Sequence, residues 1–526
     1  MNRKLIIGTR GSELALWQAN YIKDRLAEKG IESELKIIKT QGDNIQHLRL
    51  DKLEGKGFFT KELEEELLSE KIDIAVHSHK DLPTVNPPGL SIAAVSDRED
   101  PSELLLILKE SVDPKKKFNL KEDAIVGTSS NRRKSQLLSF RPDFKVKDLR
   151  GNVNTRIRKL RAKDYDAIMI AKAGVKRIEI DLSDLHVEEI NPTEFIPAPA
   201  QGVLAIQIRE TDNELFQALQ SIHNKEVAEA IGVERKVLNL FEGGCHMPLG
   251  SYCRFEDGKY QVWTSKANEG GDFPDRLFIS ADNTEGLAER ILEKFNQNRA
   301  LPKSVFISRE LTENNYFYKA LKKHQIEIKG SSLIKINPLL ENLEAALLEN
   351  VDWVFFSSRN GIEHFFKLNP VLNGNTKFAV VGRGSEETLK KYVNADYTGE
   401  DEGIDMVQVG REFAKIAKGK TVLFPRAKGS LLTIRKELTG DTKVIDLPIY
   451  ETVPSDNASK SDAEVLVFTS PSNVKAYFAE HSVNPGQKII SIGYSTGEAL
   501  SALGLSYSLP YSPDEVGLAE AVFGLD

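Results

Sequence analysis

Residues 72–81 read Ile72-Asp73-Ile74-Ala75-Val76-His77-Ser78-His79-Lys80-Asp81. The apolar residues that open this stretch predict a buried strand, and the leucines spaced along residues 60–71 predict an amphipathic helix before it. A helix that leads into a buried strand is the repeating unit of α/β folds. In open α/β sheets, ligands gather at the carboxyl ends of the strands. We therefore expect chemistry at the end of this strand, where Lys80 and Asp81 lie.

The same alternation of strands and helices extends in both directions from this stretch. Residues 5–8 predict a strand, and Ser12 is placed to cap a helix that ends at Gly30. Polar residues and a proline at 296–303 predict a linker, after which residues 305–308 start a new strand. The chain is therefore predicted to be an α/β multidomain protein.

The second part of the chain contains an internal repeat. Residues 354–362 (VFFSSRNGI) match residues 466–474 (LVFTSPSNV) at an offset of 112. Each copy continues with a glycine followed by a hydroxyl residue, Ser385 in the first and Thr496 in the second. This pattern predicts two similar α/β domains in which a Ser or Thr after a strand caps the next helix or offers backbone amides to an anion.

The strands predicted at residues 305 and 422 also correspond, but the first precedes one whole copy and the second lies inside it. We therefore expect the chain to start one domain over 304–337, leave to build the other over 338–447, and return over 448–526. Two crossing strands would then join the domains.

The composition excludes several classes of protein. With 526 residues, of which 40% are apolar, the chain is too long for one core and too apolar for disorder. Two cysteines exclude a disulfide framework. The N-terminus lacks the apolar run of a signal peptide, and no stretch approaches the roughly 18 apolar residues of a membrane span. We expect a cytoplasmic protein that has no membrane partner.

One segment has a local charge very different from the net charge of −7 of the whole chain. Residues 128–177 contain fifteen Lys and Arg against four acids, a local charge of +11. Two motifs within it, GTSSNRR at 127–133 and LRGNVNTR at 149–156, combine hydroxyls, backbone amides and arginines, which suits carboxylates or phosphates. A solvated helix face is the alternative for residues 158–163. A nucleic-acid partner is disfavoured because no aromatic residues interleave the arginines.

Two further groups are candidates for chemistry. Asp81 could stabilise a developing cation while Lys80 holds an anion, although such a pair is more often a surface salt bridge. Cys245, within EGGCHMP at 242–248, is a thiol exposed between glycines and a proline, whereas Cys253 looks like an ordinary strand residue. We expect no metal site, because Cys245 and His246 cannot easily converge on one ion and a fourth ligand is missing.

These motifs together resemble hydroxymethylbilane synthase, also called porphobilinogen deaminase, over about residues 3–298. The strings that carry the resemblance are GTRGS at 8–12, GKGFFTKEL at 55–63, AVHSHKDLP at 75–83, the two arginine motifs, AGVKR at 173–177, QG at 201–202 and EGGC at 242–245. The sequence departs from the family at His79, where Met or Leu is common, and at His246.

The resemblance implies two periplasmic-binding-protein-like α/β domains, over 1–96 with 198–216 and over 97–197, and a small α+β domain over 217–298, before a linker at 299–303. It implies that Cys245 carries a covalent dipyrromethane cofactor and that Asp81 and Lys80 are catalytic. The implied cofactor-binding residues are Cys245, Asp81, Lys80, Thr128, Ser129, Ser130, Arg132, Arg133, Arg150 and Gly174. The implied binders of the substrate carboxylates are Arg10, Ser12, Lys61, Arg150, Arg156 and Arg177.

Residues 303–526 resemble uroporphyrinogen-III synthase, through the doubled strand motif, the interleaved domain order and LPIYET at 447–452. The resemblance implies two α/β domains with hydroxymethylbilane bound between them. Ser358, Ser385, Ser470 and Thr496 fall at matching substrate-binding positions, and Tyr450 matches a tyrosine proposed to assist departure of the substrate hydroxyl. With few ionisable groups there, we expect catalysis mainly through the folding of the substrate.

Our hypothesis is a monomeric, bifunctional enzyme that converts porphobilinogen to uroporphyrinogen III. Two alternatives stay open: a hydroxymethylbilane synthase with an inactive C-terminal scaffold, and a small-anion binding protein, since two-lobed α/β domains with arginine clusters also suit solute capture.

Overall fold

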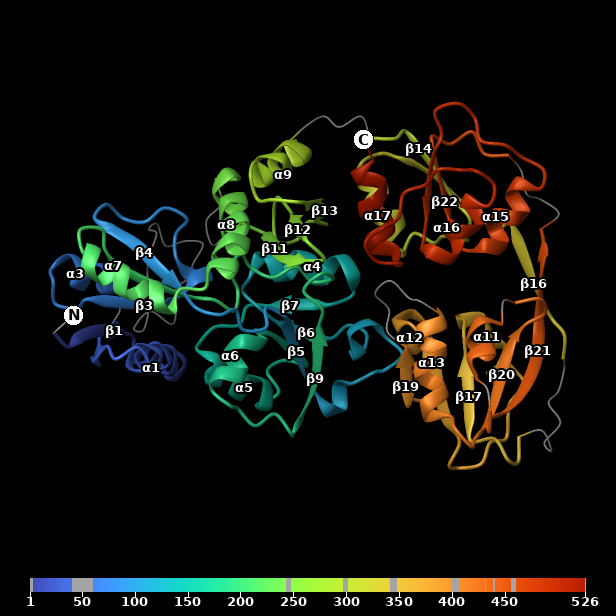
Figure 1. Cartoon of the computed structure of the whole chain (residues 1–526), viewed down its shortest axis with the longest axis horizontal. Helices are drawn as coiled ribbons and strands as arrows, with labels where there is room; N and C mark the ends of the chain where they lie inside the picture. The colour runs from blue at the N-terminus through green and yellow to red at the C-terminus, as the bar shows by residue number, and fades with distance from the viewer. Residues whose placement is uncertain are drawn as a thin grey trace. The chain divides into compact units, whose positions relative to one another are not determined.

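The computed structural model describes residues 3–39, 60–242, 247–296, 301–340, 348–399, 406–430, 432–438, 440–455 and 460–525. The chain divides into two compact units, Met1–Arg299 and Ala300–Asp526 (Figure 1). Both units are built from mixed α/β layers, so the prediction of an α/β multidomain protein is confirmed. In the described part of the chain, no helix is long and apolar enough to cross a membrane.

The first sheet of unit 1 has five strands in the order β2-β1-β3-β10-β4. Their bounds are Ser33–Ile37, Leu5–Thr9, Ile74–Ser78, Leu204–Arg209 and Leu90–Val95. Helix α1 (Glu13–Ala27) begins at its N-cap Ser12, as predicted, and α3 (Lys61–Leu68) precedes β3. Strand β3 begins two residues later than Ile72, and Asp73 adjoins β1 through its amide, which donates to the Ile6 carbonyl, and its carboxylate, which accepts from the Ile6 amide, both at 2.9 Å.

The second sheet contains the basic segment and has the order β7-β6-β8-β5-β9. Its strands span Lys145–Lys147, Ile125–Gly127, Ala167–Ala171, Glu103–Leu108 and Leu185–Ile190. Because β7, β6 and β8 are parallel, their carboxyl ends meet at one edge of the sheet. The helices that follow them are α4 (Asn131–Phe140), α5 (Val153–Arg161) and α6 (Lys172–Arg177).

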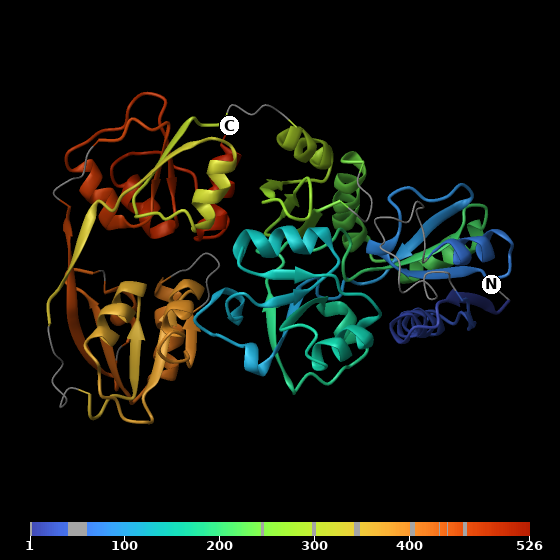
Figure 2. The same ribbon diagram turned by 180° about the vertical axis from the view of Figure 1, so that it is seen from behind.

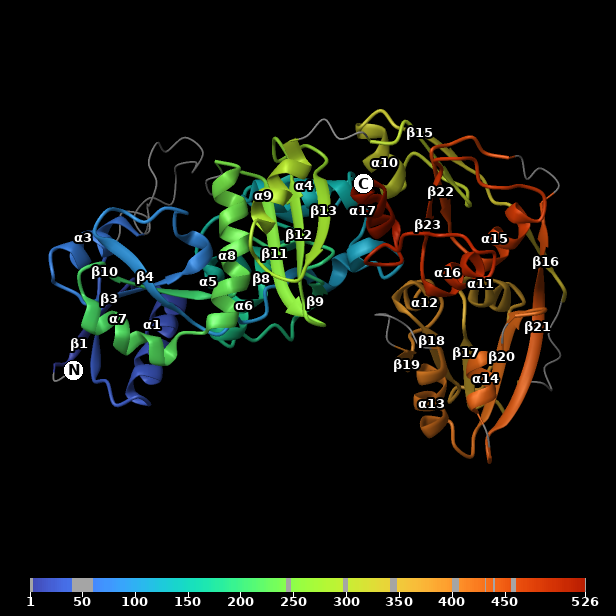
Figure 3. The ribbon, with the colours of Figure 1, turned by 45° about the horizontal axis from the view of Figure 1, so that its top comes forward.

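A small antiparallel sheet completes unit 1 (Figure 3). It consists of β11 (Leu249–Glu256), β12 (Lys259–Lys266) and β13 (Asp275–Ala281). Helices α8 (Lys225–Leu240) and α9 (Leu287–Asn296) pack on it and bury Cys253 in a shared apolar core. Helix α7 (Asn213–Leu219) instead packs with the core of the first sheet.

Unit 2 contains two sheets. The four-stranded sheet has the order β15-β14-β22-β23, with bounds Glu327–Gly330, Ser304–Ile307, Val465–Phe468 and Lys488–Ser491. The six-stranded sheet has the order β16-β21-β20-β17-β18-β19, with bounds Ile334–Pro338, Lys443–Pro454, Thr421–Ala427, Trp353–Phe356, Lys377–Val381 and Tyr397–Gly399.

The helices of unit 2 follow the strands of both sheets. They are α10 (Tyr316–Lys323), α11 (Arg359–Lys367), α12 (Arg383–Leu389), α13 (Met406–Ile416), α14 (Thr433–Glu437), α15 (Pro471–Phe478), α16 (Tyr494–Ser501) and α17 (Glu515–Gly524). Strands β16 and β21 pair antiparallel and connect the two sheets at one edge of the unit (Figures 1 and 2).

The sequence repeat corresponds to a structural repeat. The pairs β17–α11 and β22–α15 have the same form, and Ser358 and Ser470 each accept a hydrogen bond from the amide three residues on. Both serines therefore cap their helices, which is the simpler of the two predicted roles. Ser385 and Thr496 lie inside the first turns of α12 and α16, where each is buried.

Candidate functional site

A short 3₁₀ turn, η2 (His79–Asp81), follows β3 and carries the Lys-Asp pair. The His79 amide donates to the Val203 carbonyl at 2.9 Å. Val203 directly precedes β10, the neighbour of β3, so this bond holds the start of the turn against β10. Asp81 is exposed, whereas Lys80 is half-buried and donates from Nζ to Gln201 Oε1 at 3.2 Å. The pair therefore lies at the carboxyl end of a strand, where the sequence predicted it.

The ammonium group of Lys80 is strongly influenced by its surroundings. Burial lowers the pKa of Lys80 to about 8; the Asp81 charge opposes this change and the Arg133 charge adds to it. Because this pKa lies above 7, Lys80 keeps its proton at neutral pH for most of the time. The group can thus serve as a cation that holds an anion and can also release a proton with little cost.

Arg132 and Arg133 are buried at the start of α4 and converge on Glu103. Arg132 Nη2 lies 2.6 Å from Glu103 Oε1, and Arg133 donates through Nε and Nη2 to the two carboxylate oxygens at 3.1 and 2.7 Å. Burial alone would raise the pKa of Glu103, but the charges of Arg133 and Arg132 hold it at about 2. The two arginines are thus fixed in place by one carboxylate.

Glu103 was not among the predicted site residues. Its only signal in the sequence is an acid that opens the otherwise apolar strand Glu103–Leu108. A fully buried carboxylate needs a cationic partner, so this position pointed to an arginine partner without identifying it.

Arg156 extends the same cluster of charges. It donates from Nε to the Gly151 carbonyl at 2.8 Å. Burial and the nearby Arg133 charge lower its pKa to about 10, while Asp81 and Glu103 act in the opposite direction. Cations therefore outnumber carboxylates in this cluster, which we define as Lys80, Asp81, Glu103, Arg132, Arg133 and Arg156. Such an excess of buried positive charge favours the binding of a polycarboxylate.

The hydroxyls of the first arginine motif bond to the backbone. Ser129 donates to the Leu149 carbonyl and accepts from the Leu149 amide, both at 3.0 Å, which ties the two arginine motifs together. Ser130 caps α4, and Thr128 accepts from the Ser130 amide at 3.2 Å. These residues shape the loops around the cluster.

The remaining predicted residues of unit 1 have separate surroundings. Arg177 is buried, donates to the Gly202 carbonyl at 2.6 Å and lies over the Trp17 ring. Lys61 is exposed and 3.9 Å from Glu65. Arg10 and Arg150 are half-buried, Ser12 caps α1, and Gly174 lies in α6, where an added Cβ would be in ordinary van der Waals contact with Val153.

The structure describes one of the two cysteines, Cys253. Cys245, with its neighbour His246, lies outside the described residues. Cys253 is buried, and burial followed by the charge of Glu234 raises the pKa of its thiol far above the usual range. Cys253 is thus an unreactive core residue, as expected from its strand sequence.

In unit 2 the structure brings together two of the predicted residues. Ser358 Oγ and the Tyr450 hydroxyl lie 3.0 Å apart, and burial raises the pKa of Tyr450. His364 stacks on the Tyr450 ring with centroids 5.1 Å apart. No pattern in the sequence singles out His364, because a lone histidine on an amphipathic helix resembles any polar surface residue.

Family models match both parts of the chain. The model described as porphobilinogen deaminase, dipyromethane cofactor binding domain, matches residues 5–217, and that described as uroporphyrinogen-III synthase HemD matches residues 315–520. The porphobilinogen deaminase of Fusobacterium nucleatum is 45% identical over 290 residues, which cover 54% of this chain and 94% of that protein. The porphobilinogen deaminase of Oceanobacillus iheyensis is 42% identical over 286 residues, covering 54% and 89%.

Solved structures also match. A uroporphyrinogen-III synthetase from Helicobacter pylori covers 43% of this chain and 100% of its own, with 18% identity and a TM-score of 0.32. A mutant uroporphyrinogen III synthase from Thermus thermophilus covers 39% and 91%, with 14% identity and a TM-score of 0.30.

Proposed function

The N-terminal part of this chain belongs to the porphobilinogen deaminase family and a uroporphyrinogen-III synthase domain follows it, so we propose that one polypeptide performs two consecutive steps of tetrapyrrole biosynthesis. The first step polymerises porphobilinogen to hydroxymethylbilane with release of ammonia. The second inverts the last ring and closes the macrocycle with loss of water, which yields uroporphyrinogen III. The observation that carries the proposal is that both domains lie in one chain.

The described residues fit the dipyrromethane group that the family model implies. Each ring of such a group carries two carboxylates, and the cluster around Glu103 has four cations against two acids. Burial lowers the pKa values of Lys80 and Arg156, and the charge of Arg133 lowers both further, so anionic ligands would stabilise these cations. When bound, the group supplies the growing end to which porphobilinogen is added.

Within this site we assign Asp81 to the reacting ring and the basic residues to the carboxylates. Loss of ammonia from porphobilinogen leaves an electron-poor pyrrole, and an ionised Asp81 would stabilise its positive charge. Lys80, Arg132, Arg133 and Arg156 would hold carboxylates close to Asp81. Thr128, Ser129, Ser130, Arg150 and Gly174 would shape the cofactor side of the site, and Arg10, Ser12, Lys61 and Arg177 the substrate side.

For the second step we assign the hydroxyl pair of Tyr450 and Ser358 to departure of the substrate hydroxyl. A buried phenol with a raised pKa stays protonated and can donate a hydrogen bond to that leaving group. Ser470, Ser385 and Thr496 lie at the matching positions of the repeat, and we assign their helix starts to carboxylate binding.

One product assay tests both activities. Purified protein given porphobilinogen should yield uroporphyrinogen III, measured by chromatography of the oxidised porphyrins. Type I isomer alone would show an inactive C-terminal scaffold. Reversible binding of porphobilinogen without ammonia release would instead support an anion-binding protein.

We also propose an oligomeric state, a location, partners and domain boundaries for the enzyme. We propose a monomeric enzyme in the cytoplasm, without nucleic-acid or membrane partners, and the domain boundaries given by the sequence. The acidic total charge supports the absence of a nucleic-acid partner. Light scattering on the purified chain checks the monomer.

A further inference from the structure

The ammonium group of Lys80 has one hydrogen-bond acceptor in the described part of the chain, Gln201 Oε1 at 3.2 Å. An ammonium group carries three N–H donors, so two of them stay available for the carboxylates of a ligand. A lysine side chain is long and flexible, and it loses rotamer entropy when it is fixed. The acceptor therefore decides how firmly Lys80 can be held in one place.

Gln201 is 1% exposed, and both ends of its amide are hydrogen-bonded. Nε2 donates to the Pro101 carbonyl at 2.7 Å, while Oε1 accepts from Lys80. Because an ammonium group only donates and a carbonyl only accepts, these partners fix the orientation of the amide. Pro101 lies two residues before Glu103, which opens β5. The amide of Gln201 thus connects the turn that carries Lys80 with the chain that leads to Glu103.

The turn that carries Gln201 has an unfavourable backbone conformation. Ala200 has a φ of +60°, in a region that residues with a Cβ rarely adopt. Gly202 has a φ of +90°, and a Cβ added there would lie 2.1 Å from the Glu99 carbonyl oxygen. Backbone strain persists only where surrounding contacts over-determine the conformation, and it is concentrated at functional sites. Contacts from outside the turn must therefore hold Gln201 in place.

A buried ion pair supplies these contacts. Glu234, on α8, is fully buried and accepts from the Ala200 amide and from Arg98 Nη1, both at 2.6 Å. Arg98 also donates from Nε to the Gln201 carbonyl at 3.1 Å. Hydrogen bonds that involve charged groups are about twice as strong as those between neutral groups. The ion pair thus fixes the main chain of Gln201, while Pro101 fixes its amide.

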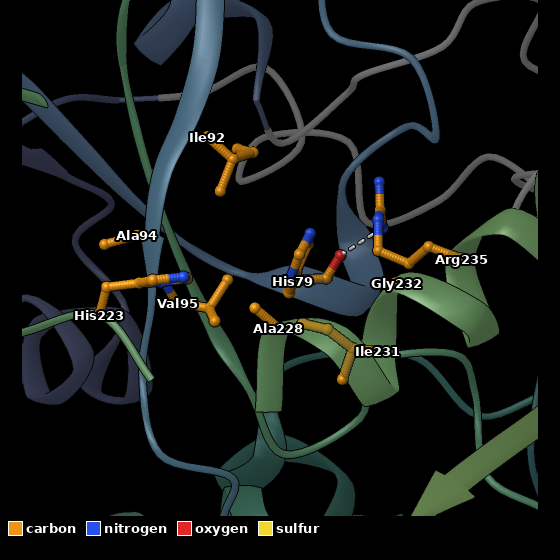
Figure 4. A pocket seen from close by; sticks show the side chains of 9 residues that line it. All are labelled: His79, Ile92, Ala94, Val95, His223, Ala228, Ile231, Gly232 and Arg235. Carbon is orange, nitrogen blue, oxygen red and sulfur yellow. Dashed lines mark hydrogen bonds between the residues drawn. The ribbon is translucent and has the colours of Figure 1, made fainter. Parts of the chain in front are cut away.

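Helix α8 also holds the donor side of the hydrogen bond between Lys80 and Gln201. Arg235 directly follows Glu234 and donates from Nη1 to the His79 carbonyl at 3.0 Å (Figure 4). His79 opens the turn that carries Lys80, and His79 and Arg235 both line a cavity beside α8. Two neighbouring residues of one helix therefore hold the turn of the donor and the turn of the acceptor.

The same hydrogen bond affects the charge of Lys80. Burial lowers the pKa of Lys80 to about 8. Four charged side chains act on it as well, two carboxylates that raise the pKa and two guanidinium groups that lower it: Asp81, Glu103, Arg133 and Arg132. A hydrogen bond to the charged form of an amine raises its pKa. Without the Gln201 acceptor, the pKa of Lys80 should therefore fall below 8.

We propose that Gln201 is a positioning residue for the first step, which directs the ammonium group of Lys80 towards the carboxylates of the substrate. Gln201 acts through Lys80 and makes no contact with the reacting ring. The inference rests on the proposed function, in which Lys80 holds a carboxylate close to Asp81. Because the folded chain has already ordered the Lys80 side chain, less entropy is lost when the carboxylate binds.

The reactivity of the Lys80 amine measures this role without turnover. Trace acetylation by acetic anhydride at several pH values, on the complete cofactor-loaded chain, gives the titration midpoint of Lys80 from the mass of its peptide. Gln201→Met keeps the length of the side chain but removes the acceptor, and should lower the midpoint by at least about one pH unit. Gln201→Glu supplies a charged acceptor and should raise it. Gln220→Met, at an amide that donates to the Ala93 carbonyl at 2.9 Å, should leave it unchanged.

The kinetics of porphobilinogen consumption test whether the effect passes through Lys80. Gln201→Met and Lys80→Met should each raise KM at least about tenfold, with a smaller change in kcat. The double variant should equal Lys80→Met, because Gln201 then has no ammonium group to direct. Additive losses in the double variant would overturn the proposal, as would equal midpoints in wild type and Gln201→Met.

Two further outcomes separate this inference from other causes. Gln201→Glu provides the test where Gln201→Met does not fold, and a midpoint that falls in Gln201→Glu would show a general loss of structure and overturn the proposal. The midpoints do not depend on turnover. A chain with the expected midpoints but no porphobilinogen consumption would therefore contradict the proposed function and still support the control of Lys80 by Gln201.

Discussion

The carboxylate of Glu103 accepts two hydrogen bonds from Arg133, from Nε at 3.1 Å and from Nη2 at 2.7 Å, and both residues are buried. Arg132 adds a third donor at 2.6 Å. One acid thus fixes both arginines of the first arginine motif and keeps them rigid before any ligand arrives.

Glu103→Gln should destabilise the protein by about 3–5 kcal/mol, because it leaves two buried cations without their counter-charge. Urea unfolding of the full chain measures the loss. Glu122→Gln, which removes an exposed acid from the same region, is the control and should have little effect. A Glu103→Gln protein as stable as wild type would contradict the positioning role.

Asp81→Asn should reduce ammonia release from porphobilinogen at least ~100-fold, because the amide keeps the shape of the side chain but not its negative charge. Folding should be unaffected, since Asp81 is exposed. Circular dichroism checks the fold, and Asp282→Asn, an exposed acid on another loop, is the matched control. Turnover within a few-fold of wild type would refute the assignment.

Intact mass should distinguish the two cysteines. Cys253 is buried and its thiol pKa is raised, so Cys253→Ala should retain a covalent dipyrrole adduct. Cys245→Ser should lack the adduct. An adduct that persists in Cys245→Ser, or a wild-type mass without any adduct in a host able to supply it, would exclude the assignment of Cys245.

The stability of the protein should fall as the pH is lowered from about 6.5 towards 4. Burial lowers the pKa of His77 to about 4. Between pH 6.5 and 4, His77 therefore binds a proton in the unfolded chain but not in the folded chain. The stabilisation that neutral His77 contributes is complete above the pKa of His77 in the unfolded chain. It is lost as the pH falls, and the free energy of unfolding then decreases by up to about 3 kcal/mol.

Urea unfolding at several pH values tests this dependence. His77→Gln should flatten the slope between pH 6.5 and 4, because Gln carries no titrating group. Some slope should remain, since the pKa of His79 is lowered in the same direction. An unchanged slope in His77→Gln would show that His77 titrates normally.

Tyr450→Phe should lower the yield of the type III isomer about tenfold while porphobilinogen consumption stays constant. The substitution removes the hydroxyl that lies 3.0 Å from Ser358 Oγ but keeps the ring that His364 covers. Tyr392→Phe, at a half-exposed phenol stacked on Phe366, is the control. An unaltered isomer ratio would remove Tyr450 from the second step.

The sequence by itself determined the features that depend on local order. The helix that Ser12 caps, the caps at Ser358 and Ser470, and the position of Lys80 and Asp81 after a strand follow from apolar periodicity and the hydrogen bonds of nearby backbone amides. The assignment of the two parts of the chain to two enzyme families also followed from the order of motifs along the chain.

Only the tertiary structure decided which side chains meet. Glu103 and Arg133 are thirty residues apart, His364 meets Tyr450 across two elements, and His79 faces a cavity lined by α8. Glu103 meets Arg133 because β5 is antiparallel to β8 and therefore starts at the edge of the sheet where the parallel strands β6 and β8 end. The other contacts form because helices cover the sheets. A local pattern specifies a strand or a cap, but the pKa of Glu103 or Lys80 depends on burial and on charges that only the packed chain brings near.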